Sequence, residues 1–307
     1  MSRLIKQFAV QVGFDVCGIT KAEDVGNEKD VLRLWLDRGY NAEMGYMANY
    51  FDKRCDPTLL VEGAKSIICV ALNYYPEVKQ NLENPQFAYY AYGKDYHDVI
   101  KEKLRKLFNY LLSLVPNLSG RFFCDTAPVL ERHWATKSGI GFIGKNGMLI
   151  IPHKGSYFLL GELIVDVELE YDRPMKQLCG NCTKCIDACP TNALEKPYLL
   201  NSNKCISYQT IENKGEISFD VKSNLNNKVF GCDICQQVCP WNRFAKPTSV
   251  GEFIPKQDLL DITGEKLLNM TPDGFNVLFK GSAVKRAKYC GLKRNMQAIV
   301  DSDKTES

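Results

Sequence analysis

The stretch that organises this chain is Cys179-Gly-Asn-Cys-Thr-Lys-Cys-Ile-Asp-Ala-Cys-Pro190. Its cysteines follow a C-x2-C-x2-C-x3-C-P spacing, which is typical of ligands to iron–sulfur clusters. A shorter run follows at Cys232-Asp-Ile-Cys-Gln-Gln-Val-Cys-Pro240, and Cys205 lies alone between the two runs. Together they supply eight thiolates, the number that two [4Fe–4S] clusters need. The pattern therefore predicts a protein that transfers electrons.

The order of the cysteines also predicts which cluster each one binds. In two-cluster ferredoxins the fourth cysteine of the long run does not return to its own cluster but serves the other one. By this rule the first cluster takes Cys179, Cys182, Cys185 and Cys239, and the second takes Cys189, Cys205, Cys232 and Cys235. Structural zinc is the alternative, since paired C-x2-C spacings also bind zinc. Each run has a further cysteine followed by proline, which a zinc ribbon does not need, so iron–sulfur ligation is favoured.

The composition is that of a soluble protein with room for two domains. Of its 307 residues, 45% are hydrophobic and 24% charged, and the formal net charge is +3. That charge is too small to indicate nucleic-acid binding by itself, and no apolar run approaches the ~18 residues of a membrane span. The N-terminus, Met-Ser-Arg-Leu-Ile-Lys, lacks the apolar core of a secretory signal. We expect a cytoplasmic monomer with reduced thiols, not associated with membranes.

Sequence patterns divide the chain into three parts. Residues 1–170 contain a continuous apolar run at 66–73, which predicts a buried strand, and a helical pattern at 98–115, which predicts the longest helix. A composition shift then marks a cluster module at 171–247, and a helical tail follows at 248–307. Further strands are expected at 14–20, 120–124, 148–151 and 157–169, and further helices at 28–38 and 128–137. The glycine-rich segment 139–147 is interpreted as a tight turn, with a phosphate-binding loop as the less favoured alternative.

Asp125 is the best candidate for chemistry before the cysteine runs. It follows the strand expected at 120–124, where apolar surroundings would raise the pKa of its carboxyl and let it donate a proton. Asp125 could equally cap the helix expected at 128–137, since Asp ahead of Pro is a common N-cap arrangement. The local sequence leaves both interpretations open. Glu131 and Arg132 are expected to form a structural ion pair or to lie exposed on that helix.

Several blocks together resemble epoxyqueuosine reductases, cobalamin-dependent iron–sulfur enzymes of queuosine biosynthesis in tRNA. The blocks are Gly-Lys-Asp-Tyr-His at 93–97, Asp-Thr-Ala-Pro-Val-Leu-Glu-Arg at 125–132, Gly-Phe-Ile-Gly-Lys-Asn-Gly at 141–147, Leu-Gly-Glu-Leu at 160–163, Cys-Ile-Ser-Tyr-Gln-Thr-Ile-Glu at 205–212, Gly-Cys-Asp-Ile-Cys-Gln-Gln-Val-Cys-Pro-Trp-Asn at 231–242 and Gly-Ser-Ala-Val-Lys-Arg-Ala-Lys at 281–288. The resemblance covers nearly the whole chain. Longer family members continue into a helical-repeat domain, so this chain is expected to be a short form.

The resemblance implies an α+β fold in which a catalytic domain related to nitroreductases and reductive dehalogenases precedes a ferredoxin-like two-[4Fe-4S] module and a short helical tail. Cobalamin would lie between the catalytic domain and the module. The implied reaction reduces the epoxide of epoxyqueuosine to the alkene of queuosine, the last step of its biosynthesis. Asp125 matches the family's proton donor beside the cofactor. Arg54, Tyr96 and Ser207 sit in matching blocks and would contact cobalamin.

A basic segment near the C-terminus gives a separate indication of RNA binding. Six basic residues and no acid occur between 280 and 294: Lys280, Lys285, Arg286, Lys288, Lys293 and Arg294. A helix that follows phosphates has this composition, although a solvated helix face does too. We expect these residues to contact tRNA. The other implied partner is an unidentified low-potential electron donor.

Two other functions remain open from the sequence. One is a corrinoid reductase of a small molecule, similar to reductive dehalogenases, and the other is a plain iron–sulfur electron carrier. Dehalogenases are usually exported with a twin-arginine signal, which this N-terminus lacks. An electron carrier would not need the long segment that precedes the cysteine runs.

Overall fold

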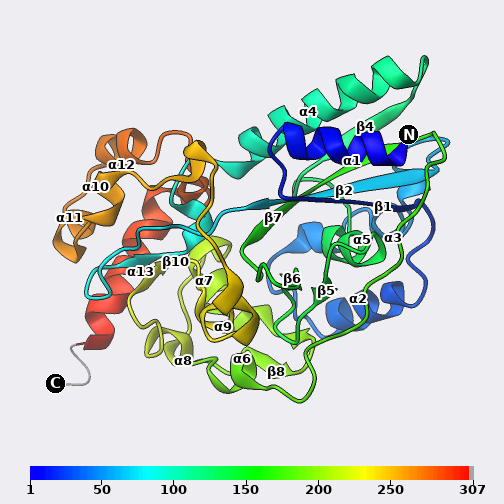
Figure 1. The fold of residues 1–307 in the computed structure, drawn as a ribbon. Helices are drawn as coiled ribbons and strands as arrows, with labels where there is room; N and C mark the ends of the chain where they lie inside the picture. The colour runs from blue at the N-terminus through cyan, green and yellow to red at the C-terminus, as the bar shows by residue number, and fades with distance from the viewer. Residues whose placement is uncertain (304–307) are drawn as a thin grey trace.

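A four-stranded antiparallel sheet forms the centre of the molecule in the computed structural model, which describes residues 1–303 (Figure 1). Its strand order is β1-β2-β7-β4, with β1 at Val16–Lys21, β2 at Ser66–Asn73, β7 at Phe158–Val165 and β4 at Gly120–Phe123. The apolar run predicted at 66–73 is β2, which lies between β1 and β7 and is buried along nearly its whole length. A continuous apolar run is expected where both faces of a strand are covered.

Helices cover both faces of this sheet. On one face lie α1 (Ser2–Gln11) and the longest helix, α4 (Tyr96–Leu114), whose leucines pack on β7. On the other face lies α5 (Glu131–Lys137), with Trp134 fully buried against the sheet. A Cβ atom on Gly161 would lie 2.8 Å from Ile100, so glycine at this position lets α4 approach β7 closely.

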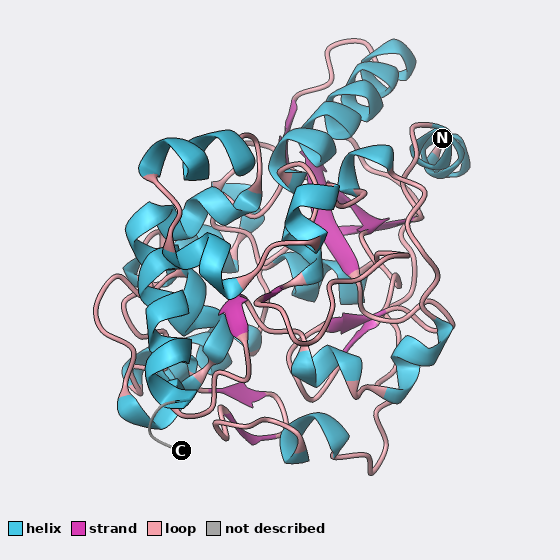
Figure 2. Ribbon diagram, turned by 90° about the vertical axis from the view of Figure 1, so that its left-hand side faces the viewer, coloured by secondary structure: helices cyan, strands magenta, loops and turns pink. Residues whose placement is uncertain are grey.

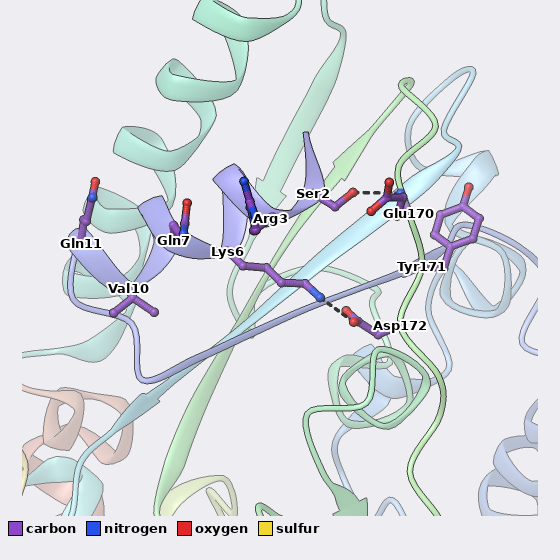
Figure 3. A pocket seen from close by; sticks show the side chains of 9 residues that line it. All are labelled: Ser2, Arg3, Lys6, Gln7, Val10, Gln11, Glu170, Tyr171 and Asp172. Atoms are coloured by element: carbon purple, nitrogen blue, oxygen red, sulfur yellow. Dashed lines mark hydrogen bonds and ion pairs between the residues drawn. The ribbon is translucent and has the colours of Figure 1, made fainter.

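A shallow groove separates α1 from the segment that leaves the sheet (Figure 3). Lys6 forms an ion pair with Asp172, and the Ser2 hydroxyl accepts a hydrogen bond of 2.9 Å from the backbone N–H of Glu170. Both contacts tie α1 to the chain after β7. Figure 1 places α1 on the opposite side of the sheet from α6 and α9, which carry cysteines of the two runs, so the groove anchors a helix and lies far from those cysteines.

The cysteine runs lie in a region of short elements that is joined to the rest of the chain by a strand pair. This region contains α6 (Lys184–Asp187), β8 (Leu194–Lys196), β9 (Leu199–Leu200), α7 (Ile206–Ile211), α8 (Phe219–Lys222), β10 (Lys228–Phe230) and α9 (Ile234–Gln237). β10 pairs in parallel with β3 (Gln86–Phe87), so the first half of the chain supplies the neighbouring strand. The domain boundaries predicted at 170 and 247 stay a prediction.

The last part of the chain is helical, as expected. It contains α10 (Gln257–Leu260), α11 (Gly264–Leu268), α12 (Pro272–Leu278) and α13 (Lys288–Asp303), and the 3-10 helix η7 (Ala283–Ala287) leads into α13. α13 packs on β10, α7 and α11. Figure 2 shows these helices gathered on the side opposite the N-terminus. The predicted tail extends over 304–307, which lie outside the described residues.

The remaining elements are short. They are α2 (Glu28–Asp37), α3 (Phe51–Cys55), β5 (Phe142–Ile143) and β6 (Leu149–Ile150). β5 and β6 form a hairpin entered through the glycine-rich segment, and a Cβ on Gly141 would lie 2.4 Å from the carbonyl oxygen of Ile150. This close approach is the one expected for a tight turn. Within residues 1–303, no helix is both long and apolar enough to span a membrane.

Two predicted boundaries are wrong in an informative way. The helix expected to start at Pro128 starts at Glu131, because residues 124–129 fold into consecutive tight turns in which Thr126 N donates to Cys124 O and Val129 N to Ala127 O. The helix expected from Asp98 starts at Tyr96, because the Asp95 side chain accepts the backbone N–H of His97 and caps it. Both differences fall where candidate site residues lie.

Candidate active site

Four cysteines line a common cavity, and they are the four predicted to bind the first cluster. Cys179, Cys182, Cys185 and Cys239 surround a space of about 160 Å³, together with Lys145 and Trp241. The ammonium group of Lys145 donates hydrogen bonds to the carbonyls of Gly180 and Cys182 at 2.7 and 3.0 Å, which fixes the loop of the first run. The fold thus brings a cysteine from the second run to the first, as crossed ligation requires.

The other four predicted ligands, Cys189, Cys205, Cys232 and Cys235, are half-buried like the first four. Burial raises the pKa of Cys232 to about 12, and it also raises the pKa values of Cys205 and Cys235. The charge of Cys189 contributes to the raised pKa of Cys205, and the charge of Cys205 contributes to the raised pKa values of Cys232 and Cys235. The four thiols therefore lie close enough to interact electrostatically. Such thiols lose their protons when they bind iron, so loading of this site is coupled to proton release.

The spacing of the cysteines also bears on the zinc alternative. Among the described residues, no three His, Cys, Asp or Glu side chains come close enough together to hold a single metal ion. The cysteines of the first set instead surround a cavity. This arrangement fits a polynuclear cluster better than a tetrahedral zinc ion.

Asp125 lies in the turn after β4, next to the start of α4. The Tyr96 hydroxyl donates a hydrogen bond of 2.6 Å to Oδ2 of Asp125, and Nε2 of His97 lies 3.3 Å from the same oxygen. On the other side of its ring, Nδ1 of His97 lies 2.7 Å from Oδ1 of Asp95. The Asp125 side chain is 58% exposed, so these contacts leave it open to a bound molecule.

The expectation that the pKa of Asp125 is raised is wrong. The hydrogen bond from His97 lowers the pKa of Asp125, and this effect and that of Tyr96 outweigh the burial that would raise it. Burial alone would lower the pKa of His97, but its hydrogen bonds to Asp125 and Asp95 dominate and raise it to about 9. At neutral pH the proton of this pair therefore resides on His97, and Asp125 is ionised.

The alternative role of Asp125 as a helix cap is also excluded. Helix α5 begins at Glu131 after Leu130, and no side chain caps it. The Asp125 carboxylate is bonded to Tyr96 and His97 instead. Glu131 does not pair with Arg132 as expected: its Oε1 accepts the backbone N–H of Asp125, while Arg132 donates to the carbonyl of Gly147 at 3.0 Å.

Arg54 belongs to a second set of polar groups, which includes Tyr46. Its side chain is 8% exposed, and one terminal nitrogen donates to the carbonyl of Tyr46 at 2.9 Å. Burial, together with the charges of Glu212 and Asp125, raises the pKa of Tyr46 to about 12, so Tyr46 lies within electrostatic reach of Asp125. The buried Nε of Arg54 has no hydrogen-bond partner within residues 1–303. A buried donor of this kind is suited to a ligand oxygen.

The other two residues predicted to contact cobalamin are also placed. The hydroxyl of Tyr96 is committed to Asp125, which makes Tyr96 part of the acid–base group. Ser207 is half-buried in α7, two residues after Cys205, and its hydroxyl forms no hydrogen bond within the described part of the chain. Ser207 therefore remains available to a ligand.

The six basic residues predicted to contact tRNA differ in their surroundings. Arg294 donates to the carbonyls of Gln209, Asn213 and Gly215, so its guanidinium stabilises the module and is not free for phosphates. Arg286 forms two hydrogen bonds with Glu212, at 2.8 and 2.7 Å, and lies over the ring of Tyr46. The other four, Lys280, Lys285, Lys288 and Lys293, are exposed. The interpretation as one continuous phosphate-following helix is wrong, since the six residues are spread over the turn after α12, η7 and α13.

Sequence reasoning missed three residues of the site: His97, Glu131 and Glu162. His97 lies in a block quoted for the resemblance, beside Tyr96, but only the fold brings it to Asp125. Glu162 had a local signal, because it is the single acid in the otherwise apolar strand Phe158–Val165. It is completely buried there.

Two family models match the chain. Residues 54–126 match "Epoxyqueuosine reductase QueG, DUF1730", and residues 178–242 match "4Fe-4S double cluster binding domain". The first match ends just after Asp125, and the second covers both cysteine runs. The fold and the site thus define an iron–sulfur oxidoreductase that holds two [4Fe-4S] clusters.

Curated relatives and solved structures identify the family. The chain is 50% identical to the epoxyqueuosine reductase of Cellulophaga algicola over 97% of both chains, and 36% identical to that of Escherichia coli over 96% of this chain and 79% of the other. An epoxyqueuosine reductase solved with an epoxyqueuosine-modified tRNA-Tyr stem loop is 33% identical, with a TM-score of 0.91 over 97% of this chain and 80% of that one. The Bacillus subtilis enzyme, solved with its catalytic aspartate loop swung out of the active site, is 32% identical, with a TM-score of 0.90 over the same shares. The chain belongs to the epoxyqueuosine reductase family, which confirms the family and the α+β fold predicted from the sequence.

Proposed function

We propose that this chain reduces epoxyqueuosine to queuosine at the wobble position of tRNA. The observation that carries the proposal is an exposed carboxylate, Asp125, bonded to a protonated imidazole in a protein that also holds two electron-transfer clusters. Family membership supports the substrate, since a related reductase was solved with an epoxyqueuosine-modified stem loop. In the reaction both C–O bonds of the epoxide break, two electrons and two protons are taken up, the alkene forms and the oxygen leaves as water.

The Asp125–His97 pair supplies a proton to the departing oxygen in this proposal. An epoxide oxygen that leaves as an alkoxide is a poor leaving group, and a positioned acid typically contributes about 10²–10⁴-fold to the rate. Tyr96 and His97 both contact Oδ2 of Asp125, so Oδ1 remains available to the substrate. His97 stores the proton at Nε2, and Asp125 transfers it to the substrate.

Cobalamin is the cofactor of this proposal, and two groups fit it. The unpartnered Nε of Arg54 and the hydroxyl of Ser207 can donate to amide or phosphate oxygens of a corrinoid. Bound cobalamin would supply a low-potential cobalt that adds electrons to the substrate carbon. Asp125 and Tyr96 would complete the surroundings of the reacting groups, as the family resemblance implies.

The remaining partners belong to the same proposal. An unidentified low-potential donor supplies electrons to the clusters, and the exposed lysines 280, 285, 288 and 293 contact tRNA phosphates. The protein acts as a monomer in the cytoplasm, divided into a cobalamin-binding domain, a cluster module and a basic tail. The predicted cluster cysteines, which bind iron only as reduced thiolates, support this location.

Anaerobic turnover tests the function directly. The reconstituted protein is mixed with cobalamin, a low-potential reductant and tRNA that carries epoxyqueuosine, and queuosine is measured after digestion to nucleosides. We expect conversion by the wild type and a decrease of about 10²–10⁴-fold in kcat for Asp125→Asn, with iron content unchanged. Asp220→Asn, at an exposed position away from the site, serves as the matched control.

The outcomes separate the reaction from the role of Asp125. No conversion by wild-type protein with full iron and cobalamin content would contradict the proposed function. Full activity of Asp125→Asn would remove Asp125 as the proton donor but leave the reaction standing.

A further inference from the structure

The loop that carries Asp125 has a strained backbone and must be held in place. Asp125 adopts a φ of 57°, in the left-handed region that non-glycine residues rarely occupy. Such a conformation costs roughly 1–3 kcal/mol and persists only where surrounding contacts enforce it. The tight turns at Thr126 and Val129 are contacts within the loop itself, so the enforcing contact has to come from a neighbouring element.

Tyr96 and His97 of α4 hold the Asp125 side chain, and Glu131 provides the contact to its backbone. Its Oε1 accepts the backbone N–H of Asp125, which lies six residues earlier. Glu131 is the first residue of α5, and this helix is fixed to the sheet by the buried Trp134 and Ala135. Because α5 is fixed on the sheet, the hydrogen bond from Asp125 to Glu131 also fixes the backbone of Asp125.

Glu162 lies beneath the same contact, in the middle of β7 and opposite Phe123 at the end of β4. Side chains alternate between the two faces of a strand. Leu160 and Ile164, two residues before and after Glu162, pack in the cluster that contains Trp134, so Glu162 points to the α5 face. Glu162 is 0% exposed, and neither of its carboxyl oxygens has a hydrogen-bond partner within residues 1–303.

The two carboxyl groups cannot both be ionised at neutral pH. Burial raises the pKa of Glu162 well above its usual range, and the facing Glu131 raises it further. Burial and the charge of Asp125 raise the pKa of Glu131 to about 7. Glu162 is therefore the neutral member, with a proton to donate, while Glu131 keeps oxygens that accept hydrogen bonds.

We propose that Glu131 and Glu162 form a carboxyl latch that holds the Asp125 loop over the reaction site. The buried carboxyl of Glu162, whose oxygens have no other partner within residues 1–303, would turn its proton to Glu131, and Glu131 in turn accepts the backbone N–H of Asp125. Both are positioning residues, since neither touches the substrate in this arrangement. The inference rests on the proposed role of Asp125, and it fits the Bacillus subtilis relative, whose catalytic aspartate loop was solved swung out of the active site.

Hydrogen exchange of the peptide that spans 124–130 measures the latch without turnover. We expect Glu131→Ala to increase exchange in this peptide at least about tenfold, because an opened loop loses the hydrogen bond that holds the Asp125 amide to α5. Glu131→Gln keeps an acceptor oxygen and is expected to restore most of the protection. Glu168→Gln, at an exposed position after β7, should behave like the wild type.

Steady-state kinetics then separate positioning from folding. For Glu131→Ala we expect kcat to fall about 10–100-fold while KM for tRNA changes less than about twofold, since a displaced catalytic group costs rate without removing tRNA contacts. Glu162→Gln can still donate to Glu131 and should retain kcat within about threefold. Melting curves confirm that each variant is folded.

Three results would overturn the latch. They are wild-type exchange at 124–130 in Glu131→Ala, a fall in kcat that Glu131→Gln does not rescue, and a loss of kcat that is matched by a rise in KM. These outcomes are distinct from failure of the proposed function. If Asp125→Asn proves fully active, the exchange experiment still reports whether Glu131 holds the loop.

Discussion

The cluster module and the Asp125 site are built in opposite ways. In the module, seven of the eight predicted cluster ligands lie in two short runs, and local spacing already aims their sulfur atoms. The Asp125 site instead combines side chains from the start of α4, the turn after β4, the first residue of α5 and the middle of β7. Only the turn after β4 and α5 adjoin in the sequence, whereas α4 and β7 come from separate parts of the chain. Local sequence defines the cluster module, whereas the tertiary fold assembles the Asp125 site.

The difference is also chemical. Thiolates bind iron so strongly that the identity of the ligands largely determines cluster binding. The protein mainly has to supply enough cysteines and place their sulfur atoms within bonding distance. A proton donor depends on its surroundings, because hydrogen bonds and burial of ordinary strength shift a pKa by whole units. The pKa values of this site show this directly, since His97 lowers the pKa of Asp125, and Asp125 and Asp95 together raise the pKa of His97.

Removing a ligand should produce the largest effect and tests the module. We expect Cys239→Ala to lower the iron content from about eight to about four atoms per chain and to reduce turnover to background. Cys189→Ala should remove the second cluster instead, if ligation is crossed. Cys290→Ser, at an exposed cysteine outside both sets, is the control.

Iron analysis and electron paramagnetic resonance of the reduced proteins would read the result. Retention of both cluster signals in Cys239→Ala would contradict its assignment. Loss of the first cluster in Cys189→Ala would show that each run serves its own cluster.

His97 tests the second region, and its loss should produce the next largest effect. The folded-state pKa of about 9 lies above the ordinary 6.5, so the proton is present at neutral pH and is lost as the pH rises through 9. We expect kcat to fall above about pH 9 in the wild type. In His97→Gln, kcat at pH 7 should fall about 10–100-fold, and the basic limb should move to lower pH, because Asp125 alone releases its proton earlier.

The same ionisation stabilises the fold. The contribution of the His97 ion pairs is fully present below pH 6.5 and disappears as the pH rises through about 9. In Asp95→Asn the fall of kcat at high pH should move to lower pH, but by less than in His97→Gln. The reason is that Asp95 contacts Nδ1 of His97, the ring nitrogen that faces away from Asp125. A basic limb that stays near pH 9 in His97→Gln would exclude His97 as the proton store.

These two regions explain how far the sequence could be interpreted. The cysteine spacing predicted eight ligands, and the fold gathers four of them around one cavity. The continuous apolar run predicted β2, because a strand covered on both faces carries apolar residues at successive positions. The sequence placed Asp125 beside apolar residues but could not show that α4 brings His97 to it. It therefore predicted the wrong direction for the pKa of Asp125.

Arg294 shows the same limit on the surface. Its position in a basic segment indicated a phosphate contact, yet the fold places its guanidinium against three backbone carbonyls of the module. The sequence of a basic segment does not show which of its side chains form hydrogen bonds within the protein. Glu131 was misjudged for the same reason, because its partner is a backbone amide across a turn.

Replacing Glu162 should have a smaller effect on kcat, and it should stabilise the fold. Glu162 is a carboxyl group at the centre of the sheet, and burial of a poorly paired polar group costs about 1–3 kcal/mol. Glu162→Leu should therefore raise the melting temperature by about 2–4 °C while lowering kcat. Thermal unfolding and turnover measured on the same preparation provide the test. A lower melting temperature together with a lower kcat would make Glu162 a structural residue of the sheet.

The smallest effects are expected at the basic tail. They distinguish an exposed cation from one that the fold holds by internal hydrogen bonds. Lys288→Ala removes an exposed cation, so tRNA binding should weaken a few-fold, and the slope of log K against log salt should fall by about one. Arg294→Ala should leave that slope unchanged and lower the melting temperature, because three carbonyls lose their donor. Fluorescence anisotropy with labelled tRNA over a salt series measures both. If Arg294→Ala reduces the salt slope and Lys288→Ala does not, the basic segment itself contacts phosphate as its sequence suggested, and the internal hydrogen bonds of Arg294 must open when tRNA binds.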